Sequence, residues 1–142
     1  MTKNNFQNIL VPLDGSKYSE KALERACEFV GAFGSTLYLI YVVEKSIPVN
    51  LLDRKEYLEL LQKFGNNILN KAKIKLSKKG INAKTILKEG NISNEIEKVA
   101  KKENCNLIIV GNKGLGTVSR LILGSVSSKI SQSSSCSVLI VK

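Results

Sequence analysis

The chain has 142 residues, which suits one domain, and 43% of them are hydrophobic, so it can build a full core without disulfide or metal cross-links. It contains no histidine, which excludes Ser-His-Asp and Cys-His catalysis, histidine metal sites and the usual general base near neutral pH. A formal charge of +10 leaves nucleic acid, a membrane surface or a phosphate ligand open as partners, but the lysines are spread among glutamates, as on an ordinary solvated surface.

The cysteines and the start of the chain indicate a cellular compartment. Cys27, Cys105 and Cys136 are odd in number and far apart, which favours reduced thiols in a cytoplasm over a disulfide framework. No apolar run approaches the roughly 18 residues that a membrane span needs, and no apolar region of a signal peptide precedes the first strand pattern. We therefore expect a cytoplasmic protein without a membrane segment.

The first third of the sequence reads as a strand, a helix and a second strand. Phe6–Leu13 is a short apolar run typical of a buried strand, and Asp14-Gly15-Ser16 follows as a turn whose serine can cap a helix. Gly34 ends that helix after apolar residues at helical spacing. Thr36–Val43 is rich in β-branched and aromatic side chains and is predicted as the second strand.

The remainder continues the alternation. Pro48 favours a loop over Glu44–Arg54, and a long amphipathic helix is predicted from about Lys55 to Lys78-Lys79-Gly80. The elements expected after it are a strand over Asn82–Leu87, a helix capped by Asn91, a strand over Leu107–Val110, a helix over Val118–Ile130 and a last strand over Ser137–Val141.

Alternating strands and helices predict an α/β fold, with a single doubly wound parallel sheet of five strands and helices on both faces. In such a sheet, ligands bind outside the carboxyl ends of the strands, where the winding direction reverses. The loops after the first and fourth strands, Asp14-Gly15-Ser16 and Gly111-Asn112-Lys113-Gly114, are therefore expected to meet in space.

The fourth strand pattern is followed by glycines at Gly111, Gly114 and Gly116, which leave backbone amides uncovered for an anion. A Walker A loop is excluded because Gly-Lys-[Ser/Thr] occurs nowhere, and the Rossmann spacing G-x-G-x-x-G is missing after the first strand. The pattern present is G-x2-G-x9-G-[Ser/Thr], from Gly111 to Ser125.

This motif resembles the ATP-binding branch of the universal stress protein family, and the similarity covers nearly the whole chain. It includes I-L-V-P-L-D-G-S near the start, R-L-I-L-G-S-V-S after the glycines and C-S-V-L-I-V-K at the end. The resemblance implies one nucleotide-binding domain over residues 1–142, with an adenine-nucleotide α-hydrolase-like fold and strand order 3-2-1-4-5. It also implies ATP as the ligand, with Mg²⁺ or Mn²⁺ bound through the phosphates instead of by protein side chains.

The resemblance assigns roles to individual residues. Those implied to line adenine and ribose are Pro12, Leu13, Asp14 and Val42. Those implied to approach the ribose and the first phosphates are Val110, Gly111, Asn112 and Gly114. Those implied to hold the outer phosphates through amides and hydroxyls are Gly124, Ser125, Val126 and Ser127. Lys113 and Arg120 are not fixed motif residues, but they could add charge-assisted bonds.

Two of these residues have a structural alternative. Asp14 could simply stabilise the turn before the first helix, a common role of aspartate. Gly124 falls within the predicted helix, where glycine costs about 1 kcal/mol relative to alanine. That cost is understandable if the backbone must stay open for a phosphate.

The leading hypothesis is an ATP-binding regulatory or stress-response protein that holds its nucleotide at the carboxyl ends of strands one and four. One alternative is a slow ATPase or phosphotransferase, with Asp14 or a metal-bound water as the base and at most weak hydrolysis. Another is a basic nucleic-acid-binding module, which rests only on the net charge; we do not expect nucleic acid or a membrane as a partner.

The last strand pattern also predicts an assembly. The apolar residues Val138, Leu139, Ile140 and Val141 form an edge strand in this winding, and exposed apolar edges tend to be covered or paired. Pairing across a two-fold axis would bury them, and the family resemblance implies dimers through this strand. We therefore expect a homodimer.

Overall fold

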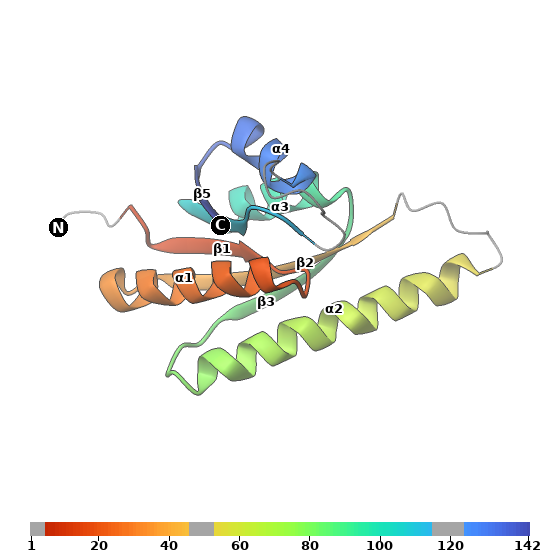
Figure 1. Cartoon of the computed structure of the whole chain (residues 1–142), viewed down its shortest axis with the longest axis horizontal. Helices are drawn as coiled ribbons and strands as arrows, with labels where there is room; N and C mark the ends of the chain where they lie inside the picture. Colours follow the sequence, from red (N-terminus) through yellow and green to blue (C-terminus); the bar gives the residue numbers. More distant parts are fainter. Residues whose placement is uncertain (1–4, 46–52, 115–123) are drawn as a thin grey trace.

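The structure is a computed structural model of the chain, and it describes residues 5–45, 53–114 and 124–142 (Figure 1). Strands and helices alternate along these ranges. The strands are β1 (Asn8–Pro12), β2 (Thr36–Glu44), β3 (Lys84–Gly90), β4 (Leu107–Gly111) and β5 (Ser137–Val141). The helices are α1 (Lys17–Phe33), α2 (Arg54–Ser77), α3 (Ile92–Lys102) and α4 (Ser125–Ser133).

The strands form one parallel sheet in the order β3-β2-β1-β4-β5, so the predicted fold and strand order are confirmed. The chain begins in the centre with β1, winds outward to β3, and returns to the other side of β1 with β4. The winding therefore reverses between β1 and β4. Their carboxyl ends, which carry the two predicted ligand loops, are neighbours in the sheet.

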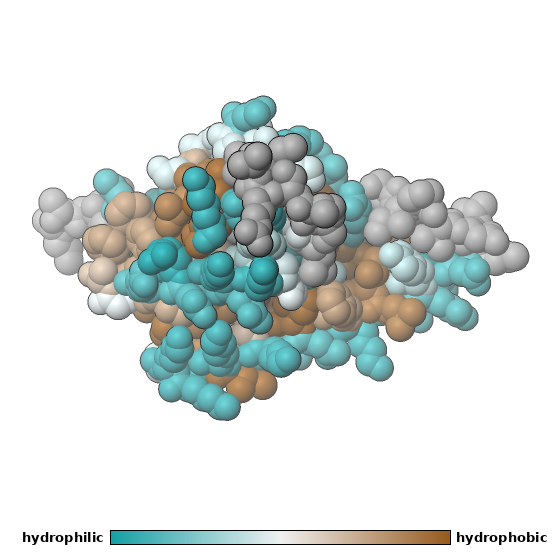
Figure 2. All heavy atoms as spheres, viewed as in Figure 1, coloured by the Kyte–Doolittle hydropathy of each residue, from teal (hydrophilic) through white to brown (hydrophobic). Residues whose placement is uncertain are grey.

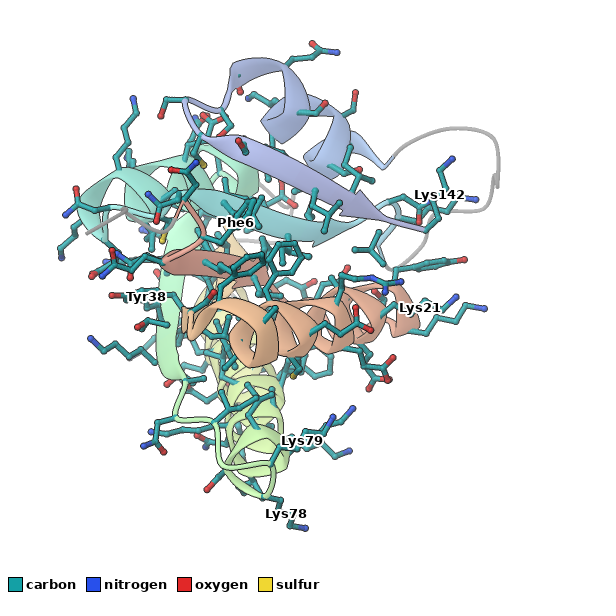
Figure 3. The ribbon with its side chains drawn as sticks, turned by 90° about the vertical axis from the view of Figure 1, so that its left-hand side faces the viewer. Phe6, Lys21, Tyr38, Lys78, Lys79 and Lys142 are labelled. Carbon is teal, nitrogen blue, oxygen red and sulfur yellow. The ribbon has the colours of Figure 1, made fainter. Side chains whose placement is uncertain are left out.

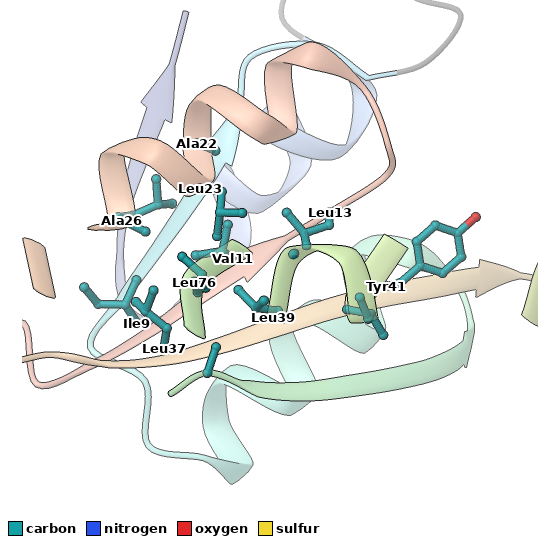
Figure 4. Close-up of a cluster of buried hydrophobic side chains, with 14 of the residues drawn as sticks. Ile9, Val11, Leu13, Ala22, Leu23, Ala26, Leu37, Leu39, Tyr41 and Leu76 are labelled. Atoms are coloured by element: carbon teal, nitrogen blue, oxygen red, sulfur yellow. The ribbon is translucent and has the colours of Figure 1, made fainter. Parts of the chain in front are cut away.

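Side chains alternate along the central strands and feed two hydrophobic layers. Ile9 and Val11 pack with α1 and α2 on one face, as Figure 4 shows, while Leu10 packs with α3 and α4 on the other. Because both faces are covered, strands β1 and β4 are apolar along most of their length, as a buried parallel sheet requires. Within the described ranges, no helix has the length and apolar character that crossing a membrane requires.

Local capping rules account for the starts of α1 and α3. The hydroxyl of Ser16 accepts a hydrogen bond from the backbone N–H of Ser19 at 3.2 Å, and the side chain of Asn91 accepts one from Asn94 at 3.1 Å. Gly34 ends α1 in the left-handed conformation, with φ at 67°. These three helix boundaries lie where the sequence predicts them.

Other boundaries differ from the prediction because tertiary contacts decide them. β1 is shorter than Phe6–Leu13 at both ends. β3 starts at Lys84, not Asn82, and runs on to Gly90 because Lys88 and Glu89 still pair with β2. The prediction of a helix over Val118–Ile130 is wrong at its carboxyl end, since α4 continues to Ser133, and its first residues, 118–123, lie outside the described ranges.

The cysteines are free thiols. Cys105 is buried in the layer under α3 and α4, and this burial raises the pKa of its thiol to about 12. The Cys105 thiol is therefore protonated at neutral pH, and a protonated thiol is a poor nucleophile.

Gly65 sets how closely α2 approaches β2. A Cβ at this position would meet the ring of Tyr41, 2.7 Å from Cε1. We expect Gly65→Ala to lower the unfolding free energy by about 1–2 kcal/mol, because overpacking outweighs the helix propensity gained. Gly31→Ala in α1 is the matched control, since a Cβ at Gly31 meets nothing within 4 Å and should stabilise by up to about 1 kcal/mol. Urea titrations measure the change in unfolding free energy of each variant. If Gly65→Ala stabilises the protein as Gly31→Ala does, the close contact with Tyr41 is contradicted.

Candidate nucleotide-binding site

A cavity of about 560 Å³ opens at the carboxyl ends of the central strands. Its wall includes all of the predicted site residues except Asn112: Pro12, Leu13, Asp14, Val42, Val110, Gly111, Gly114, Gly124, Ser125, Val126 and Ser127. The structure therefore brings together two stretches that lie nearly a hundred residues apart in the sequence. Gly116 and Arg120, also named from the sequence, lie outside the described residues.

Asp14 joins the two stretches. Its Oδ1 accepts a hydrogen bond from the backbone N–H of Ser16 at 2.9 Å, so the carboxylate stabilises the turn before α1. Its Oδ2 faces Gly114, where an added Cβ would lie 2.7 Å away. The structural and the cavity-facing interpretations of Asp14 are thus compatible, since each uses a different oxygen.

Gly111 lies on the cavity wall, and the packing of a helix also depends on it. A Cβ on Gly111 would lie 2.8 Å from both the carbonyl carbon and the carbonyl oxygen of Tyr18 in α1. Backbone atoms cannot move aside as a flexible side chain can. The absence of a side chain at Gly111 therefore allows α1 to pack against the end of β4.

Gly124 is not inside a helix, as the sequence pattern had indicated, but caps the start of α4 in an extended conformation. Its N–H donates to the carbonyl of Asn112 at 2.6 Å, and a Cβ on it would lie 3.2 Å from Cα of Lys113. The amides of the first turn of α4, beginning at Ser125, have no acceptor within the helix, and no side chain of the described residues caps them. These amides start at the cavity wall, and a helix N-terminus favours anions.

Ser127 and Asn112 stabilise this loop through hydrogen bonds. The buried hydroxyl of Ser127 lies 3.2 Å from the carbonyl of Asn112 and 3.0 Å from that of Gly124, to which it can donate. Asn112 is buried beside the cavity, and its backbone N–H donates to the carbonyl of Val141 at 2.8 Å. The backbone of Asn112 therefore connects the loop to β5 and to the start of α4. Its buried Oδ1 has no hydrogen-bond partner among the described residues.

Lys113 lies on the cavity wall between the two loop glycines, and only 6% of its surface is exposed. Across residues 5–45, 53–114 and 124–142 it forms no ion pair with a carboxylate. An unpaired ammonium group is costly to bury, and a nearby anion offsets that cost. The cavity thus combines a cation with the amino end of a helix.

Sequence reasoning missed several residues of the cavity wall, which α2, α3 and β2 supply. The residues concerned are Tyr57 and Leu61 of α2, Ile92 and Ile96 of α3, and Tyr41 and Glu44 of β2. Burial raises the pKa of the Tyr41 hydroxyl, and the nearby charge of Asp14 raises it further. No pattern in the sequence shows which turn of α2 reaches the sheet edge.

The strand order and the cavity position define a doubly wound α/β protein. Residues 5–142 match the model of the Universal stress protein family, and the chain belongs to this family. Universal stress protein YxiE of Bacillus subtilis is 35% identical, over 96% of this chain and 99% of its own. Universal stress protein MJ0531 of Methanocaldococcus jannaschii is 34% identical, over 99% and 84% respectively.

Solved structures share the fold. Universal stress protein UspA from Lactobacillus plantarum superposes with a TM-score of 0.89 at 23% identity, over 99% of this chain and all of that one. A universal stress protein in complex with cAMP gives a TM-score of 0.74 at 24% identity, over 98% and 99%. A family member from Arabidopsis thaliana with AMP bound gives a TM-score of 0.73 at 20% identity, over 96% of this chain and 91% of that one.

Proposed function

We propose that the chain is a cytoplasmic ATP-binding regulatory protein of the stress response, of the ATP-binding branch of its family. The observation that carries the proposal is Lys113, a buried cation without a carboxylate partner in the described part of the chain, beside the uncapped N-terminus of α4. Both features favour a phosphate chain. The adenine nucleotides bound by the cAMP and AMP complexes above support an adenine base.

The cavity suits the three parts of ATP. Its volume falls within the range of about 300–1,000 Å³ usual for small-molecule sites. Val42 and Pro12 offer apolar surface to the base, and Asp14 offers a carboxylate to the ribose hydroxyls. The amides of Ser125 and Val126, with Lys113, would hold the outer phosphates.

A divalent cation fits this arrangement only through the nucleotide. No group of three or more histidine, cysteine, aspartate or glutamate side chains that could hold a metal occurs among the described residues. Mg²⁺ is commonly bound through the phosphate oxygens of a substrate together with water, so the phosphates of the nucleotide would supply its ligands. When bound, the metal would neutralise charge between the phosphates.

Calorimetric titration of the purified protein with ATP and Mg²⁺ tests the proposal, together with chromatography of any nucleotide released on heating. We expect saturable binding at one site per chain. Since Lys113 and the amides of α4 serve the outer phosphates, ATP should bind at least about tenfold more tightly than AMP, a difference of about 1.4 kcal/mol. Absence of both heat and released nucleotide would overturn the proposal.

We also propose that the protein is a homodimer that pairs through β5. This strand lies at the sheet edge, and its residues Val138, Leu139 and Ile140 are only half-buried. Sedimentation at micromolar concentration should give twice the monomer mass. Leu139→Lys should give monomers, whereas Thr85→Lys on the opposite edge strand, β3, should leave the dimer intact. A folded wild-type chain that sediments only as a monomer would contradict the proposal.

A further inference from the structure

A second cavity of about 560 Å³ lies between α1 and α2. It touches the first cavity at Leu13 and Ser19, which belong to both walls, but it opens on the face of the sheet that α1 and α2 cover. Figure 2 shows apolar surface between the hydrophilic side chains of these two helices. We call it the α1–α2 groove.

The α1–α2 groove has an apolar floor and apolar walls. Leu23 of α1 and Ala72 of α2 are buried at its base, and Ile68 contributes to its wall. Phe64 and Ile74 also line it, yet 46% and 58% of their surfaces are exposed. Large apolar side chains left exposed around a groove are typical of an interaction site.

The charged residues of the groove are mostly basic. Lys71 and Lys75 of α2 and Lys78, directly after its last residue, are three or four residues apart and therefore share one face of the helix. None of them forms an ion pair within the described residues, and Glu20 is the acid on the wall. Figure 3 shows Lys78 projecting from the carboxyl end of α2. The positive charge at the carboxyl end of α2 therefore favours an anionic group of a ligand.

Phe64 and Ile68 lie nearer the amino end of α2 than Lys71 and Lys75, while Ala72 and Ile74 lie between these two lysines. From Phe64 to Lys75 the helix rises about 17 Å, at 1.5 Å per residue. That distance is about the length of an extended fourteen-carbon chain, and the groove volume is in the usual range for small ligands. A ligand with an alkyl chain and one anionic head therefore matches the groove in length, volume and polarity.

We propose that the α1–α2 groove binds a free medium- or long-chain carboxylate. The alkyl chain lies along Ile68, Ala72 and Leu23, and the carboxylate is held by Lys71 and Lys75. The proposal is independent of the nucleotide site and goes beyond nucleotide binding, because the ligand class, the helices and the charged groups that hold it are different.

Dodecanoate is the probe for this site, titrated into the full-length, nucleotide-free protein and followed by calorimetry. We expect saturable binding with one site per chain. Dodecyltrimethylammonium, which has a twelve-carbon alkyl chain but a cationic head, should bind at least about tenfold more weakly than dodecanoate. Butanoate, which has the carboxylate but only a short alkyl chain, should also bind at least about tenfold more weakly. Equal binding of the cationic amphiphile, or of butanoate, would overturn the proposal, as would no saturable dodecanoate binding.

Two double variants locate the site. Lys71→Glu with Lys75→Glu reverses two charges on the groove wall, and both side chains are exposed, so the fold should be kept. We expect it to weaken dodecanoate binding at least about tenfold. Lys63→Glu with Lys73→Glu makes the same change on the same helix outside the groove wall, and should change the affinity less than about twofold. Equal losses in both variants would contradict the assignment to the groove.

Discussion

Replacing Gly111 with alanine is expected to lower the unfolding free energy by about 3 kcal/mol, at the upper end of the range for overpacked positions. The added Cβ would lie 2.8 Å from the carbonyl carbon and oxygen of Tyr18, so either α1 or the end of β4 must shift. Urea denaturation followed by circular dichroism measures the loss.

Gly114→Ala is the matched control for this prediction. The new Cβ would lie 2.7 Å from Oδ2 of Asp14, which is a side-chain atom and can rotate away. We therefore expect a stability loss below about 1 kcal/mol, combined with weaker ATP binding because the carboxylate is displaced within the cavity. Equal losses of stability in Gly111→Ala and Gly114→Ala would contradict the prediction that Gly111 is needed for the close packing of α1.

Lys113→Met is expected to change ligand binding and stability in opposite directions. The affinity for ATP should fall about 10- to 100-fold, since hydrogen bonds to charged groups contribute about 1.5–3 kcal/mol. The unfolding free energy should stay constant or rise, because the substitution removes a buried cation without a carboxylate partner in the described part of the chain. Calorimetry with ATP and adenosine, beside thermal melts without ligand, measures both effects.

Lys129→Met provides the comparison on α4. Lys129 is exposed and is not part of the cavity wall, so its loss should leave both the ATP affinity and the stability nearly unchanged. Adenosine has no phosphates, and its affinity should not depend on Lys113. A Lys113→Met variant that binds ATP and adenosine as the wild type does would contradict a phosphate role for this lysine.

The parts of this fold that local chemistry decides are predictable from the sequence. Ser16 and Asn91 cap helices through their own side chains, and the apolar runs of β1 and β4 mark the buried centre of the sheet. The strand that depends on a partner is less predictable. Lys88 and Glu89 lack an apolar pattern and belong to β3 only because β2 pairs with them.

The cavity, too, is predictable from the sequence only in part. The loops after β1 and β4 could be predicted to meet because parallel strands present their carboxyl ends at one edge of a sheet. Asn112 and Lys113 are neighbours in one loop, yet only Lys113 lies on the cavity wall, and the direction of each side chain depends on backbone geometry that no pattern reveals. Tyr57 was missed for a related reason, since its place depends on how α2 packs across the sheet.

The two edges of the sheet differ in a way that governs the growth of any assembly. Lys84 and Lys88 lie in β3, and lysines on an edge strand hinder the addition of a further strand. β5 carries only Ser137 and apolar residues. A chain with one receptive edge and one blocked edge can join a single copy of itself, and the pair then has no receptive edge left. If the chain pairs through β5 as proposed, we therefore expect a closed, finite particle and no extended ribbons.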